Sequence, residues 1–103
     1  MSLATFQANL QALITAAKVS GDCVMFAEAP SAPTRQTQAI QDQYNQVMAD
    51  LAASNGCAFF DFVARGSGYA AMAAQGYYVD DTHLRAIGYA EEGFWLGDTL
   101  GRI

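Results

Sequence analysis

The chain has 103 residues, the length of one domain at most, and 52% of them are hydrophobic against 15% charged. This balance is typical of a globular chain with a core and excludes a disordered one. A formal net charge of −5, without a cluster of Lys and Arg, argues against nucleic acid or an anionic membrane surface as a partner. No apolar run approaches the ~20 residues that span a bilayer, and the N-terminus lacks the basic and apolar regions of a signal peptide.

The N-terminal segment is predicted to be a helix followed by a buried strand. Apolar side chains recur at helical spacing from Leu3 to Ala17, and Gly21 supplies the residue type that often follows a helix end. Residues 23–27 (Cys-Val-Met-Phe-Ala) are continuously apolar, as expected of a strand that is covered on both faces.

A second helix and strand follow a loop that contains two prolines. The loop is expected to end near Thr34, a residue suited to capping a helix. Apolar residues at helical spacing then cover 40–51, and the Asn-Gly pair at 55–56 ends the helix. Residues 57–62 form the second apolar run, which predicts another buried strand.

The last third of the chain is predicted to hold a glycine-containing loop and two helices. Residues 65–68 indicate a loop, and residues 69–75 indicate a short helix that Gly76 stops. Apolar residues at roughly helical spacing over 84–100 favour a terminal helix, although three glycines within it weaken the pattern.

This order of elements predicts an α/β fold with two parallel strands and flanking helices, because a helix between two strands makes a right-handed parallel crossover. A two-stranded parallel sheet has open edges and little area to bury on both faces. We therefore expect residues 1–103 to be a single incomplete α/β domain. The exposed sheet edge should recruit either a second copy of the chain or a missing N-terminal half.

Each of the two cysteines, Cys23 and Cys57, opens an apolar run directly after a helix, so the pair should lie side by side at one end of the sheet. Two cysteines are too few for a disulfide framework, and neighbouring parallel strands rarely supply disulfide geometry, so both are expected to be reduced. They leave the cellular compartment undecided.

The single histidine, His83, carries the chemistry that the sequence suggests. Asp80 lies three residues before it in a predicted loop, and a carboxylate at that spacing can fold back onto the imidazole. If Asp80 accepts a hydrogen bond from Nδ1, it fixes the tautomer and leaves Nε2 free to take a proton from a nucleophile.

The Asp-x-x-His block, followed by a glycine-containing helix and preceded by two strand-and-helix units, resembles the C-terminal half of the SGNH, or GDSL-type, hydrolases and esterases. The resemblance covers nearly the whole chain. It implies a partial three-layer flavodoxin-like fold, His83 as the general base of a Ser-His-Asp triad, and Asp80 as its orienting acid. Asp81 falls outside the family spacing. Such enzymes act on small ester or acylated substrates and need no cofactor.

The chain departs from this family because it contains no Gly-Asp-Ser nucleophile block. Its one Gly-Asp pair precedes Cys23, but that residue follows a helix and opens a strand, whereas the family's nucleophile follows a strand and opens a helix. Ser67 lies between two glycines, which is the composition of any flexible turn. Asp61, at the end of the second strand, could lie near the site, but it is expected instead to cap the following loop.

Metal binding is the competing chemistry for Asp80, Asp81 and His83, but these residues give at most three ligands and nothing else converges by spacing, so no metal is expected. The first functional hypothesis is thus an ester or acyl hydrolase to which this chain supplies the His/Asp end of the triad, inactive when isolated. Two alternatives stay open: a non-catalytic α/β interaction domain that keeps the hydrolase shape, and a truncated fragment with no activity alone.

Overall fold

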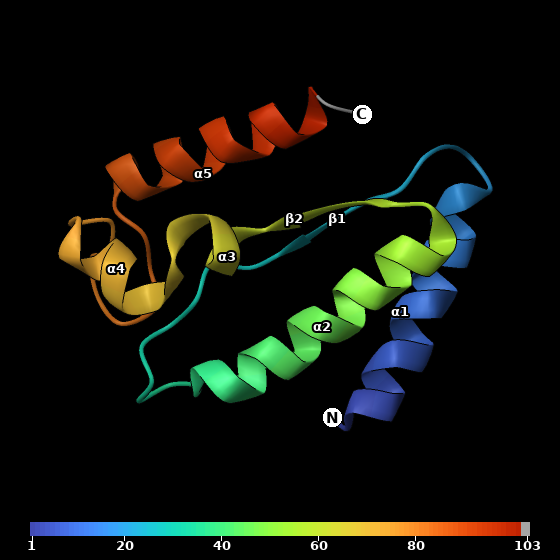
Figure 1. Cartoon of the computed structure of the whole chain (residues 1–103), viewed down its shortest axis with the longest axis horizontal. Coiled ribbons are helices and arrows are strands. Elements are labelled where there is room, and N and C mark those ends of the chain that lie inside the picture. Colours follow the sequence, from blue (N-terminus) through green and yellow to red (C-terminus); the bar gives the residue numbers. More distant parts are fainter. Residues whose placement is uncertain (102–103) are drawn as a thin grey trace.

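The computed structural model of the chain describes residues 1–101 and contains five helices and two strands within them. Helices and strands occur in the predicted order, with one additional short helix after the second strand (Figure 1). In chain order the elements are α1 (Leu3–Lys18), β1 (Val24–Ala27), α2 (Gln38–Asn55), β2 (Ala58–Asp61), α3 (Phe62–Gly66), α4 (Gly68–Ala74) and α5 (Ala86–Leu100).

The two strands pair in parallel, which confirms the predicted α/β fold class. Val24 lies opposite Ala58 and Ala27 lies opposite Asp61, so both strands end at the same edge of the sheet. α2 packs on both strands and α1 packs on α2, while α5 contacts β2 from the other side (Figure 1). The arrangement is therefore the three-layer stack of a partial flavodoxin-like sheet.

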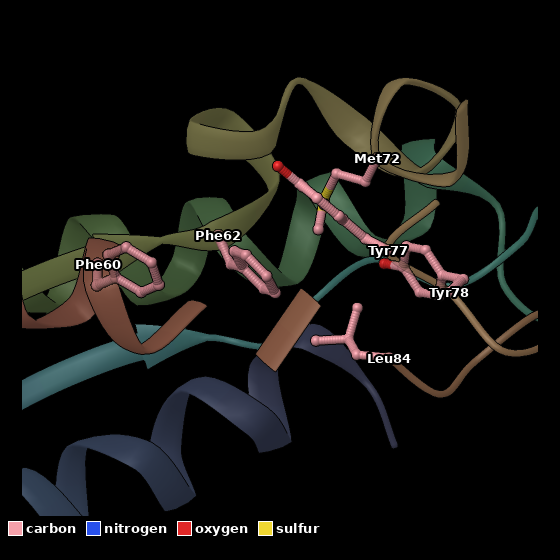
Figure 2. Close-up of a cluster of buried hydrophobic side chains, with 6 residues drawn as sticks. All are labelled: Phe60, Phe62, Met72, Tyr77, Tyr78 and Leu84. Atoms are coloured by element: carbon pink, nitrogen blue, oxygen red, sulfur yellow. The ribbon is translucent and has the colours of Figure 1, made fainter. Parts of the chain in front are cut away.

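Two clusters of buried apolar side chains hold these layers together. On the side of α1 and α2, Ile14, Met25 and Leu51 are at most 6% exposed and pack with Ala52. On the opposite side a second cluster joins β2 to the segment that carries His83 (Figure 2). Its buried members are Phe60, Phe62, Met72, Tyr77, Tyr78 and Leu84.

The structure corrects two local predictions. α2 begins at Gln38 with Thr37 as its N-cap, whose hydroxyl accepts from the amide of Ile40, so Thr34 is not the cap. Residues 62–66 form α3 where the sequence indicated strand and loop. The Asp61 carboxylate caps α3 by accepting from the Ala64 amide at 3.0 Å, and this capping role matches the expectation for Asp61.

Cys23 and Cys57 directly precede the paired ends of β1 and β2, and the two thiols lie close enough for Cys57 to affect the pKa of Cys23. The expectation that they lie side by side is confirmed, and both are free thiols. Burial and the contact with Cys57 raise the pKa of Cys23. The pair occupies the amino end of the sheet, so it lies at the opposite end from the loops that follow the strands.

β1 has an open edge, because its one pairing partner among residues 1–101 is β2. Phe26, in the middle of this strand, is 51% exposed. Hollows flank it on both sides: one of about 270 Å³ is lined by Leu13 and Met48, and one of about 310 Å³ is lined by Leu84 and Tyr89. The strand thus presents an apolar edge that no described residue covers.

Across residues 1–101, none of the helices combines the length and the apolar character needed to cross a lipid bilayer.

Gly88 permits the close approach of α5 to the segment before His83. A methyl group at this position would meet the backbone oxygen of Tyr77 at 2.5 Å and the side chain of Leu84 at 3.2 Å. Gly88→Ala is therefore expected to lower the free energy of unfolding by about 1–3 kcal/mol, measured by urea denaturation.

Gly93→Ala, in the same helix, is the matched control because a methyl group there meets nothing within 4 Å. This substitution should raise the free energy of unfolding by about 0.4–1 kcal/mol. Equal effects of the two substitutions would contradict the close-approach argument.

Candidate active site

Asp80 and His83 lie in a short loop that a pair of backbone contacts closes. Tyr78 and Leu84 form an isolated antiparallel bridge, and the Val79 amide donates to the His83 carbonyl at 2.8 Å. The Arg85 amide also donates to the Tyr77 carbonyl at 2.7 Å. The loop thus enters and leaves through two adjacent extended segments, and its buried ends, Tyr78 and Leu84, belong to the core around β2 (Figure 2).

The Asp80 carboxylate contacts the His83 imidazole directly. His83 Nδ1 lies 2.9 Å from Asp80 Oδ2 and 3.1 Å from Oδ1. The same Oδ1 accepts from the backbone amides of Thr82 at 2.8 Å and His83 at 2.7 Å. One side chain therefore both forms the turn and holds the imidazole, and the contact predicted from the Asp-x-x-His spacing is present.

These donors determine the protonation of the pair. The hydrogen bonds from the Thr82 and His83 amides, and then the bond with the His83 ring, hold the pKa of Asp80 well below its usual range. An ionised carboxylate only accepts hydrogen bonds, so the proton of a neutral His83 must reside on Nδ1. Nε2 then carries a free lone pair, and no hydrogen bond within residues 1–101 occupies it.

A second loop, between β1 and α2, fixes the position of the loop that carries His83. The Tyr78 hydroxyl donates to the Pro30 carbonyl, and the Ala32 amide donates to the Asp81 carbonyl at 2.8 Å. The Arg35 guanidinium forms an ion pair with the Asp81 carboxylate, with Nε 2.8 Å from Oδ2. Through these contacts the carboxyl end of β1 positions the Asp80–His83 pair.

Tyr78 is the buried residue among those that connect the 79–83 loop to the loop between β1 and α2. Burial, followed by the electrostatic influence of Tyr69 and Glu92, raises its pKa to about 12. Its phenol therefore stays protonated through the neutral pH range, as its role as donor to Pro30 requires.

The surface beside the loop is acidic and aromatic. A hollow of about 310 Å³ is lined by Thr82, Phe26 and Tyr89 together with two carboxylates, Glu28 and Glu92. Burial and the nearby charge of Glu28 raise the pKa of Glu92. A larger hollow of about 360 Å³ beside β2 includes no residue of the 79–83 loop and lies apart from this chemistry.

The alternative nucleophiles from the sequence do not meet His83. Cys23 lies at the amino end of β1, whereas the 79–83 loop lies at the carboxyl end. Ser67 sits at the junction of α3 and α4 in a left-handed conformation, and it lines a separate hollow with Ser31. In residues 1–101 no serine or cysteine hydrogen-bonds to the imidazole, and no three His, Cys, Asp or Glu side chains are grouped so that they could hold a metal ion.

Sequence reasoning missed the part of the site that comes from residues 30–35. Its contributions are a carbonyl, an amide and an exposed arginine, none of which forms a motif with His83. The available signal was the position of this loop directly after a parallel strand, where functional loops of α/β proteins gather.

In a comparison with known protein families, the model of the GDSL-like lipase/acylhydrolase family matches residues 1–91. The match takes in both strands, the 79–83 loop and the first turn of α5. Comparisons with curated proteins and with solved structures gave no match.

Tyr78→Phe is expected to destabilise the chain by about 1–2 kcal/mol, because it leaves the carbonyl of Pro30 without its donor. Tyr77→Phe is the matched control, since within residues 1–101 the Tyr77 hydroxyl forms no hydrogen bond, and it should change the free energy of unfolding by less than about 0.5 kcal/mol. Denaturant unfolding measures both. A Tyr78→Phe variant as stable as wild type would show that this bond contributes nothing.

Proposed function

Because the chain belongs to the GDSL-like lipase/acylhydrolase family, we propose that it supplies the acid–base half of an ester or acyl hydrolase site. His83 is the general base and Asp80 is the residue that orients it. The observation that carries this proposal is the 2.9 Å contact between Asp80 Oδ2 and His83 Nδ1, which leaves Nε2 unprotonated. The substrate is a small ester or acylated compound, and the chemistry requires no cofactor.

Each residue has one task in this reaction. Nε2 takes the proton of a nucleophilic hydroxyl as its oxygen attacks the acyl carbon, and the imidazolium that forms is stabilised by the ionised Asp80. When the ester bond breaks, Nε2 returns the proton to the departing alkoxide oxygen. Water then repeats the cycle on the acyl-enzyme, and the nucleophile is regenerated with its proton.

The nucleophile and the oxyanion donors are proposed to come from outside this chain. His83 and Asp80 are 71% and 49% exposed, so the pair now lies in water, where electrostatic stabilisation is weak. A working hydrolase site excludes water and places donors around the developing oxyanion. We therefore infer that a further segment covers this loop when the site is active.

The open edge of β1 is the proposed binding surface for that segment. A strand that pairs in parallel with β1 would end beside Glu28, at the sheet edge where the 79–83 loop lies, so residues after it would reach Nε2. Its apolar side chains would cover Phe26 and the flanking hollows. The Asn45 Nδ2 atom, buried without a partner in the described part of the chain, belongs to a residue lining another hollow beside Phe26. We propose that the segment comes from another part of a longer polypeptide or from a second copy of the chain.

The isolated chain is expected to hydrolyse short nitrophenyl esters at the background rate. One missing oxyanion donor is typically worth ~10²–10³ in rate, and here the nucleophile is missing as well. Turnover that His83→Ala abolishes, or labelling by a fluorophosphonate, would show that the chain holds its own nucleophile.

In any larger polypeptide or assembly that contains this chain and hydrolyses esters, His83→Ala should lower kcat by about 10²–10⁴-fold. Unchanged kcat in that assembly would leave the non-catalytic interaction domain as the better description.

The open edge predicts association of the isolated chain, measured as molar mass by size-exclusion chromatography with light scattering. We expect species heavier than the 11.0 kDa monomer, and Phe26→Lys should shift the population toward the monomer. Phe94→Lys is the matched control, because Phe94 is 74% exposed on α5 and lines none of the hollows beside β1. A monodisperse, cooperatively folded monomer would contradict the proposed edge.

A further inference from the structure

Two adjacent carboxylates lie near the one imidazole in the 79–83 loop. Asp80 contacts His83 Nδ1, and Asp81 lies close by. The Thr82 hydroxyl contacts all three groups. Its oxygen is 3.3 Å from Asp80 Oδ1, 3.4 Å from Asp81 Oδ1 and 3.3 Å from His83 Nδ1. The Asp81 carboxylate is thus separated from the pair by a single hydroxyl group.

Arg35 engages this second carboxylate. Its Nε lies 2.8 Å from Asp81 Oδ2, and it comes from the loop between β1 and α2, 46 residues away along the chain. The pairing with Asp81 raises the pKa of Arg35, so the guanidinium is charged at any relevant pH. Asp81 is therefore held and neutralised by a partner from another element.

We propose that Arg35 is a positioning residue for the Asp80–His83 pair: by holding the Asp81 carboxylate, it leaves Asp80 as the one carboxylate that accepts the Nδ1 proton. The inference rests on the proposed role of His83 as the base. It adds to that role a residue that selects which of two neighbouring acids orients the base.

Loop anchoring alone does not account for this ion pair. The Ala32 amide already binds the Asp81 backbone carbonyl, and Tyr78 already binds the Pro30 carbonyl, so the two loops are joined without Arg35. The guanidinium is 63% exposed and adds little as a tether. What the ion pair changes is the charge and the direction of the Asp81 carboxylate.

The other charged groups around the loop cannot replace Arg35. Glu28 and Glu92 line the hollow beside Thr82 and are acidic themselves. The Arg85 guanidinium is directed at the Tyr78 carbonyl, 2.8 Å from its Nε. Within residues 1–101, Arg35 is the one arginine or lysine that forms an ion pair with a carboxylate of this loop.

The test uses the single histidine of the chain, which gives unambiguous proton and ¹⁵N resonances. In wild type the bond to Asp80 should give the Nδ1 proton a low-field signal, and its exchange rate with water is measured at low temperature because the ring is 71% exposed. In Arg35→Gln the Asp81 carboxylate loses its partner and becomes free to draw this proton away from Asp80, so the Nδ1 proton should exchange with water at least about twofold faster.

Rescue separates selection of the acid from a structural role. Arg35→Gln combined with Asp81→Asn should restore the wild-type signal and exchange rate, because the competing charge is removed, and Arg35→Lys should restore them in part. Arg65→Gln is the matched control, since it breaks the Arg65–Asp98 ion pair of 3.3 Å elsewhere, and it should leave the signal unchanged.

Each outcome decides one question. A wild-type ¹⁵N shift showing that Nδ1 carries no proton would overturn the base role itself. A wild-type signal that Arg35→Gln leaves unchanged, or a loss that Asp81→Asn does not rescue, would overturn the positioning role of Arg35 while the base role stands.

Discussion

The Asp80 carboxylate is the group on which the geometry of this site depends. It accepts hydrogen bonds from the backbone amides of Thr82 and His83, and it also contacts Nδ1 of the His83 ring. The amide bonds keep Asp80 ionised, and its ionisation assigns the imidazole proton to Nδ1. The same carboxylate therefore forms the turn and orients the imidazole that we propose as the base, so a pair contained within four residues keeps its geometry although it lies in water.

The sheet imposes the complementary constraint. Parallel strands bring the loops that follow them to one edge, and here the loop after β1 joins the loop of Asp80 and His83 through Ala32 and buried Tyr78, while Arg35 pairs with Asp81. The same sheet leaves β1 unpaired on its outer side, with Phe26 half exposed. The site is thus supported by the core around β2 and by the loop after β1, and it is open beyond the outer edge of β1, from which we infer that the nucleophile arrives.

The sequence allowed the repeating parts of this structure to be predicted. Helical periodicity located α1 and α2, continuous apolar runs located both strands, and their order predicted parallel pairing. The predictions for Thr34 and for residues 62–66 were wrong, because a side-chain cap decides each helix start, and Thr37 and Asp61 supplied those caps. Asp80 and His83 could be paired from their spacing together with the resemblance to the last block of the GDSL-type hydrolases. Arg35 could not, because its partner lies 46 residues away and ion pairing leaves no periodic signal.

The central claim is that His83 is held ready as a base by Asp80, and the position of its proton tests this most directly. Long-range ¹H–¹⁵N correlation spectra of the ¹⁵N-labelled wild-type chain at about pH 9, where a histidine is ordinarily neutral, distinguish the two ring nitrogens. The account predicts a protonated Nδ1 and an Nε2 with the ¹⁵N shift of an unprotonated nitrogen. A proton found mainly on Nε2 would contradict it, because that tautomer can neither donate to Asp80 nor accept from a nucleophile.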